Sequence, residues 1–245
     1  RNLAKDLSDT HDIVSISRDS FDLTDRVAVD RFFNINDEFD VVIHTAIRGG
    51  RKGNVDDMSI LSDNLIMYYN LLANRGHYKK FINIGSGAEK GYPKEPYGIS
   101  KHIIRESVMK RDGFYNIKLY NVFGPDEEDQ RMIKSNILRY INKQPIKIHQ
   151  DKVMDFFYIK DFTSVVKYYV ENNLLEKEIE CCYKTINSLT DIANTINTLS
   201  DYKVDVEVEK RGNAEPYFGN GVELPILIHG LDFGIKQTYL DLKNK

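Results

Sequence analysis

Short runs rich in β-branched and aromatic residues alternate with longer amphipathic stretches along the first half of the chain. The strand-like runs are residues 11–16, 40–44, 80–84 and 116–120. The stretches of helical length between them are residues 24–35, 55–75 and 97–110. Runs of four to eight such residues are typical of buried strands, and apolar spacing of three and four is typical of helices. The order strand, helix, strand favours an α/β fold with a doubly wound parallel sheet of the Rossmann type.

The pattern changes after Gly124-Pro125. A helix is expected over residues 132–142, a short strand around residues 146–149, and a strand followed by a helix over residues 156–171. We therefore predict two interleaved parts. Residues 1–125 plus about 153–175 form a dinucleotide-binding domain. Residues 126–152 plus about 176–245 form a smaller substrate-binding domain.

Charge and cysteine content narrow the class of partner. The 245 residues carry 34 Lys and Arg against 37 Asp and Glu, a net charge of -3, so no general basic field is available to bind a nucleic acid. The two cysteines, Cys181 and Cys182, are adjacent, which suits a reducing compartment. No apolar run approaches the roughly 20 residues that cross a bilayer. We expect a cytoplasmic protein with no membrane partner, no nucleic-acid partner and no metal site.

The start of the sequence reads as the middle of a helix, Arg1-Asn2-Leu3-Ala4-Lys5-Asp6-Leu7. In a dinucleotide-binding sheet the central first strand leads into a glycine-rich turn that receives the pyrophosphate. Neither that strand nor a G-x-G-x-x-G turn occurs in the sequence. We expect on the order of 10 to 20 further residues before Arg1 to hold them.

Tyr97 and Lys101 form the strongest candidate for chemistry. Residues four apart share one face of a helix, so the ammonium is expected to lower the pKa of the phenol and make it a usable acid or base. The same spacing occurs at Tyr239 and Lys243 in a charged tail. Only Tyr97 follows a strand and its Gly85-Ser86-Gly87 turn, where open α/β sheets place their ligands.

Ser86, Tyr97 and Lys101 resemble the catalytic Ser–Tyr–Lys set of the extended short-chain dehydrogenase/reductase family, which includes the NAD-dependent epimerases and dehydratases of nucleotide-linked sugars. Further segments match that family in order: 21–25, 42–46, Asn64, 119–125, 155–161 and 234–238. The resemblance covers nearly the whole chain. It is greatest for the branch that contains GDP-L-fucose synthase and related 4-keto-sugar reductases.

The resemblance implies an NAD(P)-dependent reductase or epimerase that transfers a hydride at a sugar carbon. In it Tyr97 moves the proton, Ser86 orients the sugar oxygen, and Lys101 lowers the pKa of Tyr97 and binds the nicotinamide ribose. Substrate-binding residues would be Ser86, Lys134 and Asn136. The implied cofactor-binding residues are Ser17, Arg18, Asp22, Leu23, Thr45, Ala46, Asn64, Tyr97, Lys101 and Val122.

Departures from the family pattern narrow the activity. Gly87 and Ala88 follow Ser86, whereas the dehydratases carry an Asp-Glu pair there, so dehydration is not expected. Ala88 also stands where GDP-L-fucose synthase has the cysteine used for epimerisation. Lys134 is the only proton carrier near the position of that enzyme's second epimerisation residue. Only ten residues separate Ser86 from Tyr97, which indicates either a shortened loop or a missing segment.

Ser17 and Arg18, at the end of the second predicted strand, bear on the cofactor. They can donate hydrogen bonds to a ribose 2′-phosphate, which favours NADP over NAD and therefore net reduction. Two alternatives stay open: a nucleotide-sugar 4-epimerase that retains its NAD, and a catalytically silent dinucleotide-binding regulator. Apolar stripes on the helices at 55–75 and 97–110 predict a homodimer through these helices.

Overall fold

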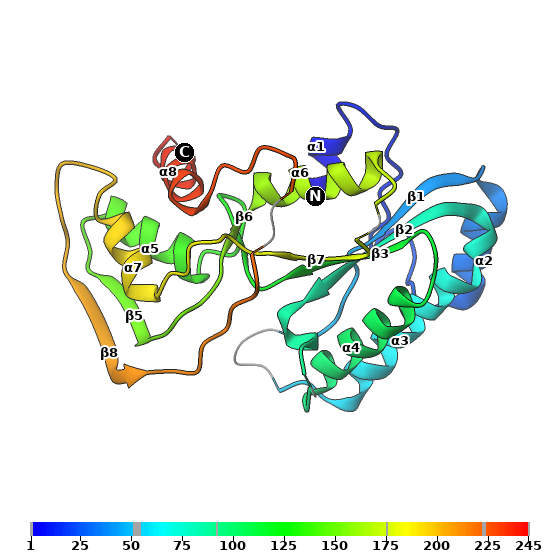
Figure 1. Cartoon of the computed structure of the whole chain (residues 1–245), viewed down its shortest axis with the longest axis horizontal. Helices are drawn as coiled ribbons and strands as arrows, with labels where there is room; N and C mark the ends of the chain where they lie inside the picture. Colours follow the sequence, from blue (N-terminus) through cyan, green and yellow to red (C-terminus); the bar gives the residue numbers. More distant parts are fainter. Residues whose placement is uncertain (1, 51–54, 92, 175, 222–223, 245) are drawn as a thin grey trace. The chain divides into compact units, whose positions relative to one another are not determined.

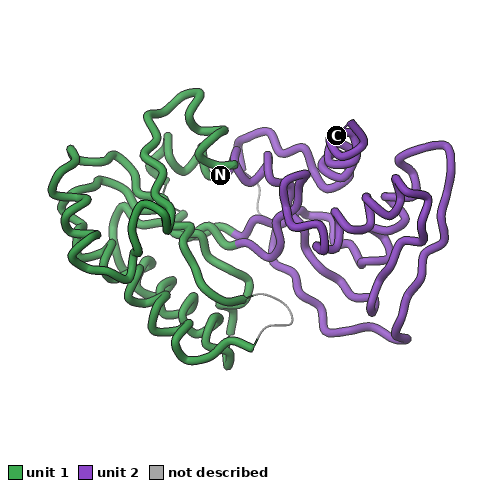
Figure 2. The backbone as a smooth tube through the Cα atoms, turned by 180° about the vertical axis from the view of Figure 1, so that it is seen from behind, with its two compact units in different colours: residues 1–118, 166–179 green, residues 119–165, 180–245 purple. Residues whose placement is uncertain are grey.

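The computed structural model describes residues 2–50, 55–91, 93–174, 176–221 and 224–244. The chain divides into two compact units, coloured separately in Figure 2. The first unit consists of residues 1–118 and 166–179, and the second of residues 119–165 and 180–245. The backbone passes from one unit to the other after residues 118, 165 and 179. The domain boundaries and functions predicted from the sequence stay predictions.

The first unit is built on a four-stranded sheet. In spatial order its strands are β1 (Phe39–His44), β2 (Tyr78–Ser86), β3 (Phe114–Leu119) and β7 (Glu178–Cys181). β1 and β2 run parallel, with Val41 opposite Lys80 and His44 opposite Asn83. Each of β1, β2 and β3 coincides with a predicted strand, so the α/β class with a parallel sheet is confirmed.

Helices lie on both faces of this sheet. Figure 1 shows α2 (Arg26–Ile35), α3 (Met58–Ala73) and α4 (Pro96–Met109) along one face, and α1 (Asn2–Leu7) and α6 (Ile159–Glu171) along the other. Successive side chains of a strand point to opposite faces. Phe81 of β2 accordingly packs among Tyr68 of α3 and Ile104 of α4. Its neighbour Lys80 points the other way and donates its Nζ to the carbonyl oxygens of Tyr169, Val170 and Asn172, 2.7–2.9 Å away, at the end of α6.

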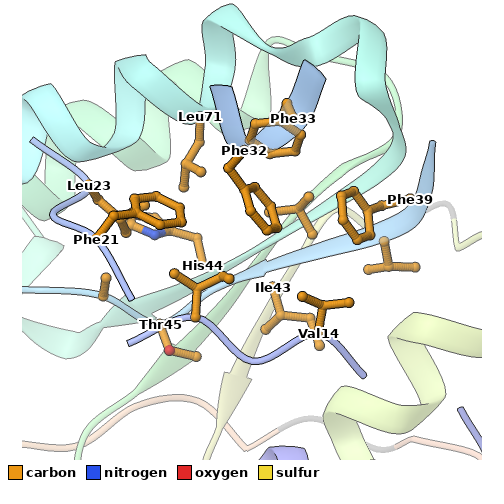
Figure 3. A pocket seen from close by; sticks show the side chains of 14 residues that line it. Val14, Phe21, Leu23, Phe32, Phe33, Phe39, Ile43, His44, Thr45 and Leu71 are labelled. Carbon is orange, nitrogen blue, oxygen red and sulfur yellow. The ribbon is translucent and has the colours of Figure 1, made fainter. Parts of the chain in front are cut away.

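The prediction of a strand over residues 11–16 is wrong. Residues 12–17 have no regular secondary structure, and among the described residues β1 pairs only with β2. A strand needs hydrogen-bonding partners along its edge, and this segment has none of that kind here. It lies near β1, and its Val14 lines an apolar cavity together with Ile43 of β1 (Figure 3). The expected strand before Arg1 stays a prediction.

The described residues of the second unit form two short parallel sheets and, besides the first part of α6, three helices. β4 (Val122–Phe123) pairs with β6 (Phe157–Tyr158), and β5 (Ile146–Asp151) pairs with β8 (Val206–Asn213). The helices are α5 (Met132–Ile141), α7 (Leu189–Ile196) and α8 (Leu231–Lys243). Their apolar faces meet in one core, which includes Ile133, Tyr140, Ile146, Ile192 and Ile235. The predicted helix over 132–142 and strand around 146–149 are confirmed.

Two general features of the described residues bear on function. Their helices are all too short or too polar to cross a lipid bilayer. Within the same described ranges, His, Cys, Asp and Glu side chains form no group of three or more that could hold a metal ion. Cys181 and Cys182 are buried free thiols.

Candidate functional site

The candidate catalytic residues lie at the carboxyl end of the sheet in the first unit. Ser86 is the last residue of β2, and His44 is the last residue of β1. Tyr97 and Lys101 lie one turn apart near the start of α4, where Pro96 occupies the first helical turn. Proline is favoured there because its missing N–H would have no helical partner. The carboxyl ends of parallel strands are where open α/β sheets bind ligands.

Ser86 and Tyr97 meet side chain to side chain. The Ser86 backbone is extended and leads into the 3-10 turn η2 (Gly87–Glu89). Its Oγ accepts the Ala88 N–H at 3.2 Å, while the Glu89 carboxylate accepts the Ser86 N–H at 3.2 Å. This reciprocal capping box fixes the serine against the turn. Ser86 also hydrogen-bonds the Tyr97 hydroxyl, so the two groups expected to hold one sugar oxygen are adjacent.

The protonation of Tyr97 differs from the sequence-based expectation. Burial raises the pKa of the phenol, the hydrogen bond from Ser86 lowers it by less, and the negative charges of Glu89 and Asp56 raise it further. The prediction that Lys101 lowers the pKa of Tyr97 is wrong for this structure. The Lys101 ammonium instead donates to the carbonyl oxygen of Ile84 at 2.5 Å. Tyr97 is therefore a neutral phenol at pH 7.

Lys101 and His44 are both buried, and the charge of Lys101 acts on the His44 ring. Lys101 is only 5% exposed, and burial lowers its pKa to about 8, although the nearby Glu89 carboxylate raises it. Burial lowers the pKa of His44 to about 3, with a further contribution from the positive charge of Lys101. The His44 ring lies beside the rings of Tyr68 and Phe81. His44 is thus a neutral packed imidazole, and Lys101 carries the positive charge of the site.

Asn64 supports the site through backbone contacts. Its side chain is fully buried in α3, where Oδ1 accepts the Arg48 N–H at 2.8 Å and Nδ2 donates to the Arg48 carbonyl at 3.0 Å. Nδ2 also donates to Ser100 Oγ, which in turn donates to the Tyr97 carbonyl at 2.7 Å. The Asn64 amide therefore ties the loop after β1 to the helix that carries Tyr97, and the prediction that Asn64 binds the cofactor stays a prediction.

Two glycines of that loop are closely packed, and one of them, Gly50, lies against the Tyr97 ring. Gly49 and Gly50 have φ angles of 79° and 71°, a left-handed conformation that glycine adopts without a steric penalty. A Cβ on Gly50 would lie 2.8 Å from the Tyr97 ring, and one on Gly49 would lie 2.7 Å from Ile60. The Gly50 N–H donates to the Asp56 carboxylate at 3.0 Å, which fixes the loop.

Replacing Gly50 by alanine should lower the free energy of unfolding by about 1–3 kcal/mol, because a non-glycine residue is strained at this φ. The new methyl group should also push the Tyr97 ring from its place beside Ser86. Urea unfolding would measure the first effect. Gly212→Ala is the matched control, since Gly212 has a φ of 76° and nothing within 4 Å of its Cβ position. If both variants kept the same activity, the contact between Gly50 and Tyr97 would have no role in placing the ring.

The short connection between Ser86 and Tyr97 depends on a third glycine. A Cβ on Gly98 would lie 2.8 Å from the Ala88 carbonyl oxygen and 2.8 Å from Pro93 Cβ. α4 therefore approaches the η2 turn more closely than any residue with a side chain would allow. This close packing lets ten residues bring Tyr97 back to Ser86.

Several predicted cofactor-binding residues surround one cavity. Leu23, Thr45 and Ala46 line it together with Val14, Phe21 and other apolar residues (Figure 3). Arg18 is exposed in the turn that starts at Ser17, whose carbonyl accepts the Ser20 N–H. Asp22 uses its Oδ1 locally, accepting the Thr24 N–H and the Thr24 hydroxyl at 2.8 Å each. Those hydrogen bonds lower the pKa of Asp22, so its carboxylate is ionised.

The remaining predicted residues belong to the second unit. Val122 is half-buried in β4 opposite Phe157. Lys134 is buried, with its Nζ 2.6 Å from the Glu127 carbonyl oxygen and 2.9 Å from the Asp129 carboxylate. The Asn136 amide makes two hydrogen bonds to the backbone of Lys147. Its Oδ1 accepts the Lys147 N–H at 2.8 Å, and its Nδ2 donates to the Lys147 carbonyl at 3.0 Å. The side chain joins α5 to β5, and its assignment as a substrate-binding residue stays a prediction.

Glu89 is the residue of the site that sequence reasoning missed. The pattern Ser86-Gly87-Ala88-Glu89 has the Ser-x-x-Glu spacing of a capping box, which the sequence analysis did not use. That spacing would have predicted the turn after β2 and the reciprocal hydrogen bonds. It would not have predicted that the carboxylate is buried.

Comparisons with known proteins agree with this geometry. Residues 1–181 match the profile of the NAD dependent epimerase/dehydratase family. No curated protein sequence matches the chain. Among solved structures, a GDP-D-glycero-L-gluco-heptose synthase from Campylobacter jejuni, determined in the presence of NADPH, superposes with a TM-score of 0.79 at 16% identity, covering 100% of this chain and 94% of that one.

Two further solved structures show the same fold. A GDP-L-fucose synthetase from Naegleria fowleri bound to NADP has a TM-score of 0.76 at 15% identity, covering 98% of this chain and 87% of that one. A UDP-glucose 4-epimerase from Thermotoga maritima with UDP-glucose has a TM-score of 0.75 at 15% identity, covering 99% and 94%. The fold, the Ser–Tyr–Lys arrangement and the profile match over most of the sequence together show that the chain belongs to the NAD dependent epimerase/dehydratase family.

Proposed function

We propose that the protein reduces the keto group of a nucleotide-linked sugar with NADPH. The observation that carries this proposal is the meeting of the Ser86 and Tyr97 hydroxyls at the end of β2, where the buried ammonium of Lys101 donates to the carbonyl oxygen of Ile84. A ketone that is reduced must receive a proton on its oxygen. The neutral phenol of Tyr97 is the protonation state which that step requires.

Each residue of the set has a distinct task. Tyr97 donates its proton to the carbonyl oxygen of the sugar, and Ser86 donates a hydrogen bond that orients the same oxygen. Lys101 places a positive charge beneath the site, which favours the negative charge that develops on oxygen as the carbonyl is reduced. Burial strengthens that effect because little water is present to screen it.

The first unit has features that fit a nicotinamide dinucleotide. The cavity beside β1 offers apolar walls for a base, and Thr45 and Ala46 line it at the carboxyl end of the strand. Tyr97 and Lys101 supply a hydroxyl and an ammonium for a ribose, and Arg18 supplies an exposed guanidinium for a 2′-phosphate. When bound, the nicotinamide supplies the hydride.

Arg18 gives a test of the cofactor preference. Replacing Arg18 by alanine should weaken NADPH binding about 10-fold or more, because a charge-assisted hydrogen bond contributes about 1.5–3 kcal/mol. NADH binding should change little, since NADH has no 2′-phosphate. Fluorescence titration with both nucleotides would measure this. Equal losses for both would show that Arg18 does not recognise the phosphate.

The substrate is best sought among GDP-linked keto sugars, because two of the similar structures are described as enzymes of GDP-linked sugars. The decisive experiment incubates the protein with a GDP-4-keto sugar and follows NADPH absorbance and the sugar product. Stoichiometric consumption of NADPH supports the reductase. Interconversion of UDP- or GDP-sugar epimers without net consumption would identify an NAD-retaining epimerase. Cofactor binding with no turnover of any nucleotide sugar would indicate a regulator.

We also propose a homodimer that forms through α3 and α4. The apolar stripe predicted on α3 is buried or half-buried, but Met58, Ile66 and Tyr69 are exposed on one side of the helix. Exposed apolar groups on one helix face favour association. Sedimentation should show a dimer at micromolar concentration, and Ile66→Asp should shift it to monomer. A wild-type protein that sediments as a monomer would reject this interface.

A further inference from the structure

A buried carboxylate lies directly behind the catalytic serine. Glu89 is 1% exposed, and its side chain makes three polar contacts. One oxygen accepts the Ser86 N–H at 3.2 Å. The other accepts Asn116 Nδ2 at 2.8 Å and lies 3.6 Å from the Lys118 ammonium. The carboxylate therefore has hydrogen-bond donors and a cation around it, which a buried charge needs.

A second layer of charges holds Lys118 in place. This lysine is 4% exposed, and its ammonium also lies 3.1 Å from the carboxylate of Glu178 in β7. Glu178 is paired with the guanidinium of Arg105 in α4. The carboxylates of Glu89 in η2 and Glu178 in β7 thus alternate with the cations Lys118 in β3 and Arg105 in α4. Burial nevertheless raises the pKa of the Glu89 carboxyl, and Lys118, the Ser86 N–H and Asn116 lower it by less.

The same residue contacts the helix that carries the other catalytic groups. The Glu89 carbonyl oxygen is bonded to Nδ1 of His102, the residue that follows Lys101, at 3.0 Å. Gly98 packs on Ala88, the residue before Glu89. The negative charge of Glu89 acts on Lys101 and on Tyr97 alike. Glu89 thus reaches Ser86 directly, and reaches Tyr97 and Lys101 through its charge and the packing of η2 on α4.

We propose that Glu89 is a positioning residue that holds the Ser86 turn and supplies the counter-charge that keeps the buried Lys101 protonated. This role rests on the function proposed above, in which Lys101 acts as a cation. The charge of an isolated ammonium at this depth would be costly, and a carboxylate on the same side of the sheet offsets that cost. Lys118 and Asn116 in turn lower the pKa of that carboxyl and so oppose the rise that burial causes.

Among the described residues, several titratable groups surround Glu89 and Lys101. The charges of Lys118 on β3 and Glu178 on β7 act on Glu89. The charge of Glu89 acts in turn on Tyr97, Lys101 and Arg105 on α4, and His102 contacts its backbone carbonyl. The charge of Lys101 acts on the neutral His44 on β1. Glu89 is therefore the anion by which the protonation of Lys101 can be changed.

The test is a titration of Lys101 in the full chain without cofactor or substrate. Protein labelled with ¹³C and ¹⁵N in lysine is followed by NMR from about pH 6 to about pH 10, and the Lys101 signal is assigned by its loss in Lys101→Met. The wild-type midpoint is expected near 8. In Glu89→Gln, which keeps the shape and the acceptor for Ser86, it should fall by about one unit or more. Glu95→Gln, which removes an exposed charge at the start of α4, should leave it unchanged.

An unchanged midpoint in Glu89→Gln would overturn the proposal, since a purely structural glutamate would not move it. A second measurement uses wild-type protein labelled in glutamate and covers the case in which the variant fails to fold. The Glu89 carboxyl signal should be that of a carboxylate at pH 7 and should shift again at the Lys101 midpoint. A protonated Glu89 at pH 7 would also overturn the proposal. Neither readout depends on turnover, so failure of the proposed activity would leave both results standing.

Discussion

Replacement of Tyr97 by phenylalanine is expected to reduce turnover by about 10²–10⁴-fold, the loss that follows removal of a positioned proton donor. The ring packs against Gly50 and keeps its place, because only the hydroxyl that meets Ser86 is removed. NADPH affinity should change by no more than a few-fold, since a dinucleotide makes many other contacts. Initial rates with the best nucleotide sugar and a fluorescence titration with NADPH would measure the two quantities separately.

The chain provides a matched control for this variant. Tyr239 and Lys243 in α8 have the same spacing as Tyr97 and Lys101, and the Lys243 ammonium lies over the Tyr239 ring. Tyr239→Phe should leave turnover unchanged, because Tyr239 packs in the core of the second unit. If Tyr97→Phe retained wild-type turnover, the assignment of Tyr97 as the proton donor would be wrong.

Replacement of Lys118 by methionine should lower the free energy of unfolding by about 3–5 kcal/mol at neutral pH. Removing one partner of a buried ion pair leaves an uncompensated charge in the interior. Here Glu89 and Glu178 would both lose the ammonium that lies 3.6 and 3.1 Å from them. Urea unfolding followed by circular dichroism would measure the change. Lys79→Met is the matched control: Lys79 pairs with Asp40 at the surface, with side chains 64% and 84% exposed, so its loss should cost under about 1 kcal/mol.

The loss in Lys118→Met should depend on pH. Burial raises the pKa of Glu89, and Lys118 is the strongest influence that lowers it, so the pKa of Glu89 should rise further without the lysine. A carboxyl whose pKa is higher in the folded state binds a proton more tightly when folded. The variant should therefore be least stable above that raised pKa and should regain stability as the pH falls toward the ordinary value of 4.5. A deficit that stays the same from about pH 8 to about pH 5 would show that charge is not its cause.

The parts of the molecule that sequence patterns predicted are those set by local periodicity. Helical spacing placed Tyr97 and Lys101 on one helix, and the β-branched run 80–84 placed Ser86 at the end of a strand. Both are seen in β2 and α4. The predicted strand over residues 11–16 failed because a strand exists only with a hydrogen-bonded neighbour, and composition does not supply one.

The electrostatics of the site could not be predicted in this way. Spacing indicated that Lys101 would lower the pKa of Tyr97, but that inference took no account of burial, which acts on both groups. The contacts of Gly50 with Tyr97, and of Glu89 with Lys118, join residues far apart in the sequence. Asn136 was assigned to substrate by its position, which gave no indication of its hydrogen bonds to Lys147.

Because the backbone passes between the two units three times, the parts of the first unit are synthesised at different times. When residue 119 leaves the ribosome, β3 is complete, but its neighbour β7 and the carbonyl oxygens that receive Lys80 belong to residues 169–181. The edge of β3 therefore stays unpaired while the residues up to β7, most of them in the second unit, are translated. An unpaired edge invites association with other chains. Slow or interrupted translation in that interval is therefore the point at which this polypeptide is most exposed to aggregation.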